Sequence, residues 1–181
     1  MRLEPLTLDH ERELLEICGD PEIWRFTTSE AQTPATMRAY LDVALHDYSA
    51  GTALPFVVRL LRTESVVGMT RLKNLSSTNL NAEVGSWFAR EAWGTGVNRE
   101  SKLLLLGYAF EQLRLIRVEF QTDALNARSR AALKRLGAVE EGVLRSRRIH
   151  RNGERRDSVF FSILDTEWPA VKGGAGGFAG P

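Results

Sequence analysis

The alternation of hydrophobic and polar residues predicts one strand, two helices and a β-hairpin before the middle of the chain. Residues 2–6 alternate as a short strand, and a short helix follows them. A longer helix begins at Thr33-Pro34 and runs to about residue 48, because threonine caps free backbone N–H groups and proline suits the first helical position. Residues 55–60 and 65–75 are rich in strand-forming side chains and flank a polar turn, which predicts a hairpin.

The next stretch joins a strand to a helix through a glycine turn. Residues 81–88 have the composition of a strand, and the Gly-Thr-Gly run at 94–96 leads into a helix that begins near Val97 or Asn98. The first turn of a helix leaves backbone N–H groups unpaired and carries a partial positive charge, so this turn suits a phosphate. The same residues also fit a tight turn without a ligand, since they match neither a Walker loop nor the dinucleotide fingerprint.

The pattern after the glycine turn predicts a crossover and then a long hairpin. Four consecutive leucines, residues 103–106, predict a helix that is buried on more than one face. Residues 116–122 alternate as a strand with one buried face, and the order strand, helix, strand makes a parallel crossover. A second helix, residues 127–136, ends at Gly137, and Asn152-Gly153 joins the last two strands.

Together these elements predict a single α/β (α+β) domain, residues 1–168, built on a mixed sheet. The chain of 181 residues is 43% hydrophobic, which is enough for one core, and it is too short for two domains of ordinary size. Residues 169–181 are rich in glycine, and we expect them to form a flexible tail outside the fold.

Composition narrows the classes of function. Because 24 basic residues face 23 acidic ones, the net charge of +1 favours neither a DNA-binding protein nor a membrane-surface protein. The chain has no apolar run of membrane-spanning length, and residues 1–20 are too charged for a signal peptide. A single cysteine, Cys18, excludes an intrachain disulfide and suits the reducing cytoplasm. His10, His46 and His150 lack metal-ligand spacing, so no metal site is expected.

Six short motifs follow one another along the chain. They are Ala-Glu-Val-Gly-Ser-Trp-Phe at 82–88, Trp-Gly-Thr-Gly at 93–96, Asn-Ala-Arg-Ser at 126–129, Leu-Gly-Ala at 136–138, Glu-Gly-Val-Leu-Arg at 141–145 and Arg-Asp-Ser-Val at 156–159. With the order of the elements, they resemble the GNAT superfamily of acyl-CoA-dependent N-acyltransferases, and more narrowly the RimJ/RimL-type protein N-acetyltransferases. The resemblance spans residues 2–168. It implies a mostly antiparallel seven-stranded sheet, splayed at its central parallel pair and flanked by about four helices.

The resemblance implies acetyl-CoA as the cosubstrate. In the family, the glycine turn and the start of the helix hold the coenzyme A pyrophosphate through backbone N–H groups. In this chain those groups belong to Gly94, Thr95, Gly96, Val97 and Asn98.

The resemblance also implies a path for the pantetheine arm. The central strand separates from its parallel neighbour, and its backbone near Trp87 and Phe88 pairs with the arm. We expect Gly85 to mark a β-bulge that opens this splay, because glycine inside a strand often does so. Asn126 would hydrogen-bond the pantetheine, and Ser129 would face the sulfur.

This chain departs from the family pattern at two positions. Family loops commonly begin with Gln or Arg three residues before the first glycine, whereas this chain has Glu91 there. A carboxylate beside a diphosphate is unfavourable, so we expect Glu91 to point to solvent. Many relatives carry, at the position of Leu133, the tyrosine that protonates the departing thiolate. The usual acid is therefore absent.

Acetyl transfer also needs a group that accepts a proton, because an N-terminal amine with a pKa of about 8 is largely protonated at neutral pH. Glu83 is the candidate base, directly or through a water molecule, because the central strand places it one alternation from Gly85 and beside the cleft. Glu83 also fits a structural carboxylate that binds nearby backbone. Asp157 is the alternative base, or else it anchors the closing hairpin.

Ser129 remains as the candidate acid once Leu133 replaces the tyrosine. Its hydroxyl could deliver a proton that water then replaces. Ser129 fits equally well as a residue that caps or packs the short helix beginning there. The N–H group of Phe88 is a candidate to polarise the thioester carbonyl, and positioning of the reactants supplies most of the rate enhancement.

The resemblance, together with these residues, implies an acetyl-CoA-dependent N-acetyltransferase that acts on the α-amine of a protein N-terminus, such as that of a ribosomal protein. Two alternatives stay open. One is a small-molecule amine acetyltransferase, and the other is a coenzyme A-binding module without turnover, which Glu91 and the absent tyrosine allow. Relatives are often dimers, so the resemblance is compatible with a homodimer.

Two further features bear on the acceptor. Residues 24–27 contain a Trp and a Phe that either anchor the core or line the mouth of the substrate site. Arginines make the closing hairpin basic, which suits either docking of an acidic peptide or ribosomal RNA, or an ordinary solvated strand surface. They are Arg145, Arg147, Arg148, Arg151, Arg155 and Arg156.

Overall fold

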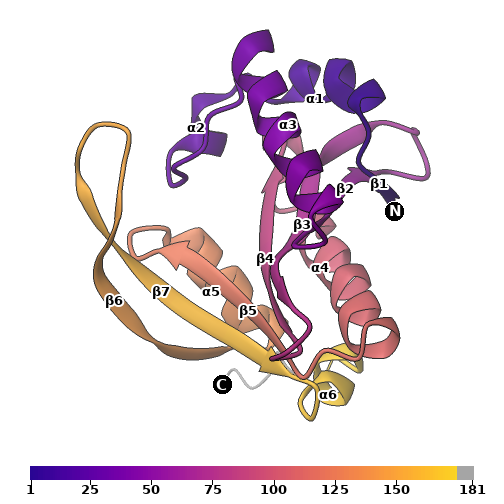
Figure 1. The fold of residues 1–181 in the computed structure, drawn as a ribbon, viewed down its shortest axis with the longest axis vertical. Coiled ribbons are helices and arrows are strands. Elements are labelled where there is room, and N and C mark those ends of the chain that lie inside the picture. Colours follow the sequence, from indigo (N-terminus) through magenta and orange to yellow (C-terminus); the bar gives the residue numbers. More distant parts are fainter. Residues whose placement is uncertain (175–181) are drawn as a thin grey trace.

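The computed structural model describes residues 1–174 and confirms a mixed α/β fold (Figure 1). Within these residues the chain forms one seven-stranded sheet with the strand order β1-β2-β3-β4-β5-β7-β6. The strands are β1 (Arg2–Pro5), β2 (Leu54–Arg59), β3 (Val66–Ser76), β4 (Asn81–Phe88), β5 (Arg117–Asp123), β6 (Val139–Ile149) and β7 (Arg155–Leu164). The helices are α1 (Glu11–Ile17), α2 (Pro21–Trp24), α3 (Pro34–Ser49), α4 (Val97–Gly107), α5 (Ala127–Leu136) and α6 (Trp168–Lys172).

The sheet divides into two arms that separate along β4 and β5 (Figure 1). The first arm contains β1, β2, β3 and β4, and the second arm contains β5, β7 and β6. β4 and β5 are parallel, and they pair from Asn81 opposite Arg117 to Val84 opposite Phe120. Beyond Val84 the pairing with β5 ends, whereas β4 stays paired with β3 up to Phe88. The backbone of β4 after Val84 therefore has one free edge, which faces the gap between the arms.

The β-bulge predicted at Gly85 is wrong. Gly85 pairs in regular register with Arg71, and the irregularity between β3 and β4 lies after Lys73. A Cβ atom on Gly85 would meet only ordinary contacts, the nearest being the Lys73 side chain at 3.5 Å. The splay thus arises where β5 leaves β4 and not from an extra residue in β4.

Short sequence signals explain the helix starts on the first arm. Thr33 accepts a hydrogen bond from the Thr36 N–H at 3.2 Å, and Pro34 occupies the first turn of α3, as predicted. Helix α2 was not predicted, because four residues are too few to show a helical period. Asp20 caps it through the Glu22 N–H at 2.9 Å. Trp24, at its end, is 1% exposed and donates its indole N–H to the Cys18 carbonyl at 2.8 Å.

Two hydrophobic layers cover the sheet. Helices α1, α2 and α3 pack over one face of the first arm with Leu14, Trp24 and Leu41 buried, and α4 packs on the opposite side (Figure 1). In α4, Leu105 and Leu106 are fully buried, but Leu104 is 42% exposed. The prediction of burial on more than one face is therefore confirmed, because the neighbouring Leu105 and Leu106 point about 100° apart around the helix, although the side with Leu104 lies in solvent.

The second arm follows the predicted turns. Gly137 adopts a left-handed conformation with φ 101° and ends α5. The turn at Asn152-Gly153 joins β6 to β7, and Gly153 has φ 80°. The tip of this hairpin reaches back to the first arm, where Arg151 forms an ion pair with Glu30.

Helix α6 extends the fold past the predicted end of the domain at residue 168. Pro169 lies in its first turn, where its missing N–H costs nothing, and Trp168 and Val171 are buried in the core. The prediction of a flexible tail concerns residues 169–181, and residues 175–181 of it lie outside the described part of the chain.

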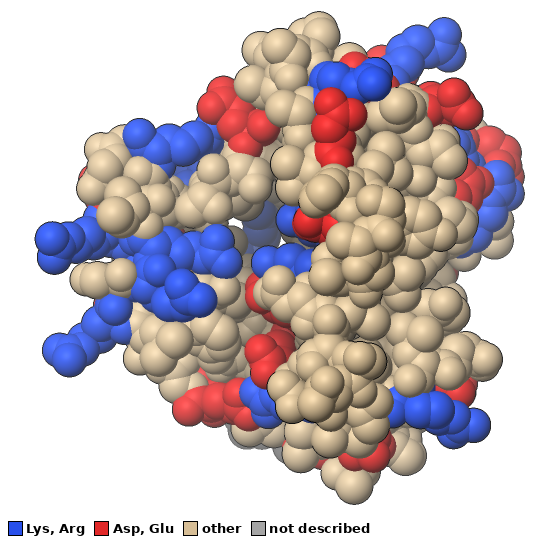
Figure 2. Space-filling model, viewed as in Figure 1, with Lys and Arg blue, Asp and Glu red and all other residues tan. Residues whose placement is uncertain are grey.

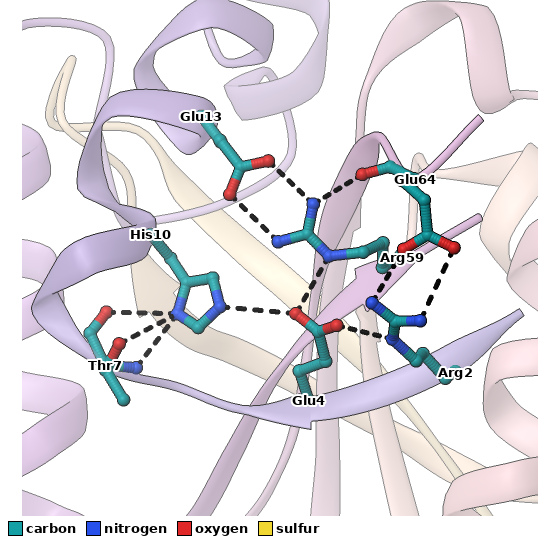
Figure 3. A network of polar contacts seen from close by, with 7 residues as sticks. All are labelled: Arg2, Glu4, Thr7, His10, Glu13, Arg59 and Glu64. Carbon is teal, nitrogen blue, oxygen red and sulfur yellow. Dashed lines mark hydrogen bonds and ion pairs between the residues drawn. The ribbon is translucent and has the colours of Figure 1, made fainter. Parts of the chain in front are cut away.

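A polar network fastens β1 and β2 to α1 at the edge of the sheet (Figure 3). The Arg59 guanidinium donates to both carboxylate oxygens of Glu13, at 2.7 and 2.9 Å, and to Glu4 at 2.9 Å. Burial alone would raise the pKa of Glu4, but hydrogen bonds from Arg59 and Arg2 lower it to about 2. This network joins elements that are far apart in sequence, and it lies away from the gap between the arms.

Candidate active site

Two cavities meet in the gap between the arms. One, of about 220 Å³, lies between β3–β4 and β5–β7, and we call it the sheet cavity. The other, of about 460 Å³, lies beside the glycine turn and α5, and we call it the loop cavity. Figure 2 shows a hollow in the middle of the visible face, with Lys and Arg (blue) and Asp and Glu (red) on its walls. Residues that line both cavities form the junction: Phe26, Thr27, Ser86, Trp87, Lys102, Asn126 and Ser129.

The glycine turn presents free backbone donors to the loop cavity. Gly94 and Gly96 have φ 77° and 90°, a left-handed conformation that an L side chain rarely adopts. The first N–H groups of α4 to find acceptors are those of Arg99 and Glu100, both bonded to the Gly96 carbonyl. Within residues 1–174, the N–H groups of Val97 and Asn98 have no protein acceptor. This arrangement fits a phosphate group.

The predicted loop residues divide into those that face the cavity and those that hold the turn. Gly94, Gly96 and Asn98 line the loop cavity. The Thr95 hydroxyl donates instead to the Ala92 carbonyl at 2.7 Å, and the Val97 side chain is buried beside Val58 and Phe88. Any contact of Thr95 or Val97 with a ligand would therefore come from backbone N–H groups.

A cationic rim surrounds the loop cavity, and the sequence analysis did not single it out. Arg99, Arg128 and Arg135 line it, and Glu22 is the only carboxylate among its described lining residues. Arg128 lies over the Trp93 ring, 3.2 Å from its centroid, and burial followed by the charge of Arg90 lowers the pKa of Arg128. Arg128 and Arg135 lie seven residues, about two turns, apart on α5, so this spacing could have placed them on one face of the helix, whereas nothing local links them to Arg99 on α4. A polyanionic ligand fits this rim.

Glu91, the departure from the family pattern, is exposed and lines neither cavity, as expected. It lies in a 3-10 turn, Arg90–Ala92, that precedes Trp93. The indole N–H of Trp93 donates to the Phe88 carbonyl at 3.0 Å and so ties this turn to the end of β4.

Asn126 and Ser129 lie at the junction. The Asn126 Oδ1 accepts the Ser129 N–H at 3.0 Å, so it is Asn126 that caps α5. Ser129 contributes its backbone to the cap, and its hydroxyl makes no hydrogen bond to another described residue. Trp87 and Phe88 line the loop cavity from the free edge of β4.

The two predicted bases lie in different places. Glu83 lines the sheet cavity and is 12% exposed. Its Oε1 lies 2.8 Å from Lys73 Nζ, and its Oε2 accepts from Asn74 at 3.0 Å. Asp157 lines neither cavity and accepts the Ser146 N–H at 2.7 Å. The structure therefore supports the hairpin-anchoring interpretation of Asp157 and not a role as base.

The structure also brings together an acid and a histidine that the sequence analysis did not connect. Asp123, at the end of β5, and His150, after β6, line the sheet cavity, and both are more than nine-tenths buried. His150 Nε2 lies 3.4 Å from Asp123 Oδ2, and Arg156 lies 3.8 Å from the same oxygen. No local pattern in the sequence signals this pair, because its members are far apart in the chain.

Positive charge exceeds negative charge in the sheet cavity. Its carboxylates, Glu83 and Asp123, both face basic side chains. Arg71, Arg148 and Lys102 also line it, and none of them forms an ion pair with a carboxylate in residues 1–174. Arg148 donates to Gln121 at 2.8 Å, and Arg71 lies over the Tyr40 ring. The basic hairpin thus turns Arg148 and Arg156 inward.

Lys102 stands out among these cations. It lines both cavities from the second turn of α4 and donates a hydrogen bond to the Asn98 side chain. Burial lowers the pKa of Lys102 to about 8. Leu133, which the resemblance aligns with the family tyrosine, is buried and lines the sheet cavity.

Residues 1–174 contain no group of three or more His, Cys, Asp or Glu residues placed to hold a metal ion. None of the helices described here is long and apolar enough to cross a membrane.

Comparison with known proteins places this geometry in context. The family model for the acetyltransferase (GNAT) domain matches residues 1–139. The chain is 37% identical over 146 residues, 81% of its length and 74% of the relative, to a protein of Bacillus subtilis (strain 168) named "Putative ribosomal N-acetyltransferase YdaF". A crystal structure of a "putative acetyltransferase" from T. thermophilus is 38% identical with a TM-score of 0.84, covering 95% of this chain and 89% of the other.

A more distant structure shares the fold alone. Spermidine N-acetyltransferase from Vibrio cholerae, in complex with CoA and spermine, is 21% identical with a TM-score of 0.79. The match covers 93% of this chain and 97% of that one.

Proposed function

Because this chain belongs to the GNAT acetyltransferase family, we propose that it transfers the acetyl group of acetyl-CoA to the N-terminal α-amine of a protein. Members of this family are acetyltransferases that use acetyl-CoA, so the cosubstrate and the reaction class follow from membership. The identity of the acceptor amine is what we propose. The name of the Bacillus subtilis relative, a ribosomal N-acetyltransferase, supports a protein N-terminus and suggests a ribosomal protein.

Acetyl-CoA fits the loop cavity. The unpaired N–H groups of Val97 and Asn98 suit the pyrophosphate, and the arginine rim suits the remaining phosphate. The free edge of β4 past Val84 offers backbone groups to the amides of the pantetheine arm near Trp87 and Phe88. Asn126 would bind the arm at the junction, where Ser129 would face the sulfur.

The acceptor would occupy the sheet cavity, on the other side of the junction. One observation carries the choice of a peptide over a polyamine: the unpaired positive charges of Arg71, Arg148 and Lys102. Each of them repels a cationic substrate, and the repulsion is stronger in a partly buried cavity than in bulk water. A polyamine carries several positive charges, whereas a peptide N-terminus carries one beside neutral amides.

Glu83 is the proposed base, acting through a water molecule. Its carboxylate lies on the wall of the sheet cavity, and both of its oxygens are held by Lys73 and Asn74, which favours a relay over direct contact. The Ser129 hydroxyl, which has no protein partner among the described residues, would lie next to the leaving sulfur. The Phe88 N–H would polarise the acetyl carbonyl.

The test is an acceptor panel with purified protein and acetyl-CoA, in which thiol release and the mass of each product are measured. It includes peptides with free N-termini, the same peptides with blocked N-termini, and spermidine. We expect acetylation of the free peptides at the α-amine, none of the blocked copies, and a lower kcat/KM for spermidine. A higher kcat/KM for spermidine would replace the proposal with a small-amine acetyltransferase. Coenzyme A binding without transfer to any acceptor would identify a binding module.

A further inference from the structure

Lys102 is the only ionisable residue among the described residues that line both cavities. The other junction residues are aromatic, hydroxyl or amide side chains. If acetyl-CoA enters from the loop cavity and the amine from the sheet cavity, the thioester and the amine must meet at this junction. A proton that reaches the sulfur there needs a source, and the junction offers one group that titrates near neutral pH.

The surroundings of Lys102 leave its ammonium group without a fixed partner charge. It donates to the amide oxygen of Asn98, one turn earlier on α4, and lies 5.7 Å from the centroid of the Phe88 ring. It forms no ion pair with a carboxylate in residues 1–174. Burial therefore lowers the pKa of Lys102 to about 8, close to the value of about 8.5 for an ordinary thiol.

Other charged groups face the two cavities from the surrounding elements. The titratable ones are Glu22 on α2, Tyr40 on α3, Glu83 on β4, Asp123 on β5 and His150 after β6. The cations are Lys73 and the arginines at positions 71, 99, 128, 135, 148 and 156. Glu83 is paired with Lys73, and Asp123 faces His150 and Arg156, so neither carboxylate is free to hold the Lys102 ammonium.

We propose that Lys102 is the general acid of the acetyl transfer and supplies the proton that the coenzyme A sulfur takes up as it leaves. The inference rests on the proposed function. The amine nitrogen forms a bond to the acetyl carbon, the carbon–sulfur bond breaks with its electron pair on sulfur, and a proton passes from Lys102 Nζ to sulfur. The proton that the amine nitrogen loses passes through a water molecule to Glu83 and from there to solvent, and solvent reprotonates Lys102.

This assignment resolves two difficulties of the site. Leu133, at the position of the family tyrosine, has no proton to donate. The pKa of the Ser129 hydroxyl cannot be brought near neutral pH. A general acid works best when its pKa lies near the working pH and near that of the leaving group, and Lys102 meets both conditions. Ser129 then contributes a hydrogen bond at the sulfur and is not the source of the proton.

The first experiment compares Lys102→Met and Lys102→Arg with Lys134→Met as the matched control. Lys134 lies on α5, pairs with Glu140 at 2.8 Å and lines neither cavity. We expect both Lys102 variants to lose roughly 100-fold in kcat, the lower range for a general acid. Arginine keeps the charge but does not release its proton, so Lys102→Arg should retain the KM for acetyl-CoA. The wild-type kcat/KM should fall above pH about 8, and this fall should vanish in Lys102→Met.

The second experiment does not depend on activity. Thiolate absorbance in the ultraviolet gives the pKa of the thiol in bound coenzyme A. An ammonium beside the sulfur stabilises the thiolate, so the thiol pKa should be lower on the wild-type protein than on Lys102→Met. Lys134→Met should match the wild type.

A third experiment removes the side-chain amine of Lys102 and then restores an amine by chemical modification. In Lys102→Cys, treatment with bromoethylamine builds a thialysine at position 102, whose amine pKa is lower than that of lysine. Cys18 is fully buried, so the new cysteine is the accessible target. We expect recovery of kcat and a fall of kcat/KM at lower pH than in the wild type.

The results separate this inference from the proposed function. If no acceptor is acetylated, the proposed function fails, and the thiol titration still tests whether Lys102 lies beside the sulfur. If peptides are acetylated but Lys102→Met keeps its kcat, or the bound thiol has the same pKa in both proteins, Lys102 is not the acid. A loss confined to the KM for acetyl-CoA would likewise overturn the inference, because it would make Lys102 a binding residue.

Discussion

Glu83 on β4 and Glu119 on β5 are direct partners in the parallel register, yet only Glu83 lines a cavity. Glu119 is held by Arg117 at 2.8 Å. The two side chains thus have the same charge and opposite positions on paired strands, but only Glu83 reaches the sheet cavity. Glu119 is therefore a matched control for substitutions of Glu83.

Glu83→Gln should lower kcat by roughly 100-fold, because the amide keeps the contacts near Lys73 but cannot accept a proton. Glu119→Gln should leave kcat within a factor of about two, since Glu119 lines neither cavity and its charge is already paired with Arg117. Steady-state rates with a peptide acceptor give both values. Equal rates for the two variants would make Glu83 a structural carboxylate.

Gly96→Ala should weaken coenzyme A binding about tenfold and destabilise the fold by about 1–2 kcal/mol, because alanine at φ 90° is strained. Gly19→Ala is the control, because Gly19 has no such conformation and a Cβ there has nothing within 4 Å. Calorimetry measures the affinity, and urea unfolding measures the stability. Unchanged affinity in Gly96→Ala would remove the glycine turn from the cofactor site.

Arg59→Ala should destabilise the protein by about 3 kcal/mol, because it leaves Glu4 and Glu13 without their shared partner at a partly buried edge (Figure 3). Arg12→Ala should cost less than about 0.5 kcal/mol, since Arg12 is 88% exposed and lies 3.9 Å from Glu16. Urea unfolding of both variants tests the contrast. Similar losses would mean that the network is no stronger than an ordinary surface pair.

The same network predicts an acid-dependent loss of stability. The pKa of Glu4 is lowered from 4.5 to about 2 in the folded state, so its contribution is complete above pH 4.5 and is lost as the pH falls through about 2. Solvent screening keeps this contribution on the order of 1 kcal/mol. Unfolding free energies of the wild type and Glu4→Gln should differ at neutral pH and converge near pH 2. A difference that does not change with pH would contradict the assigned pKa.

Local signals in the sequence were sufficient to predict most of the helices and strands. The cap at Thr33, the left-handed Gly137 and the Asn152-Gly153 turn each act within a few residues, so they could be recognised without the fold. The exposure of single side chains depends on packing, and local signals could not give it. Leu104 and Leu105 belong to the same run of four leucines, but the position of α4 on the sheet buries Leu105 and leaves Leu104 exposed.

The family resemblance, the strand and helix order and the glycine turn could all be predicted from the amino-acid sequence, because each rests on neighbouring residues. Which side chains meet depends instead on how the elements pack in the folded chain. Lys102 joins Ser129 at the junction, and His150 joins Asp123, through strands and helices that are distant in the chain. Burial likewise lowers the pKa of Lys102 only after α4 packs against the splayed sheet, since an isolated lysine in the unfolded chain stays in water.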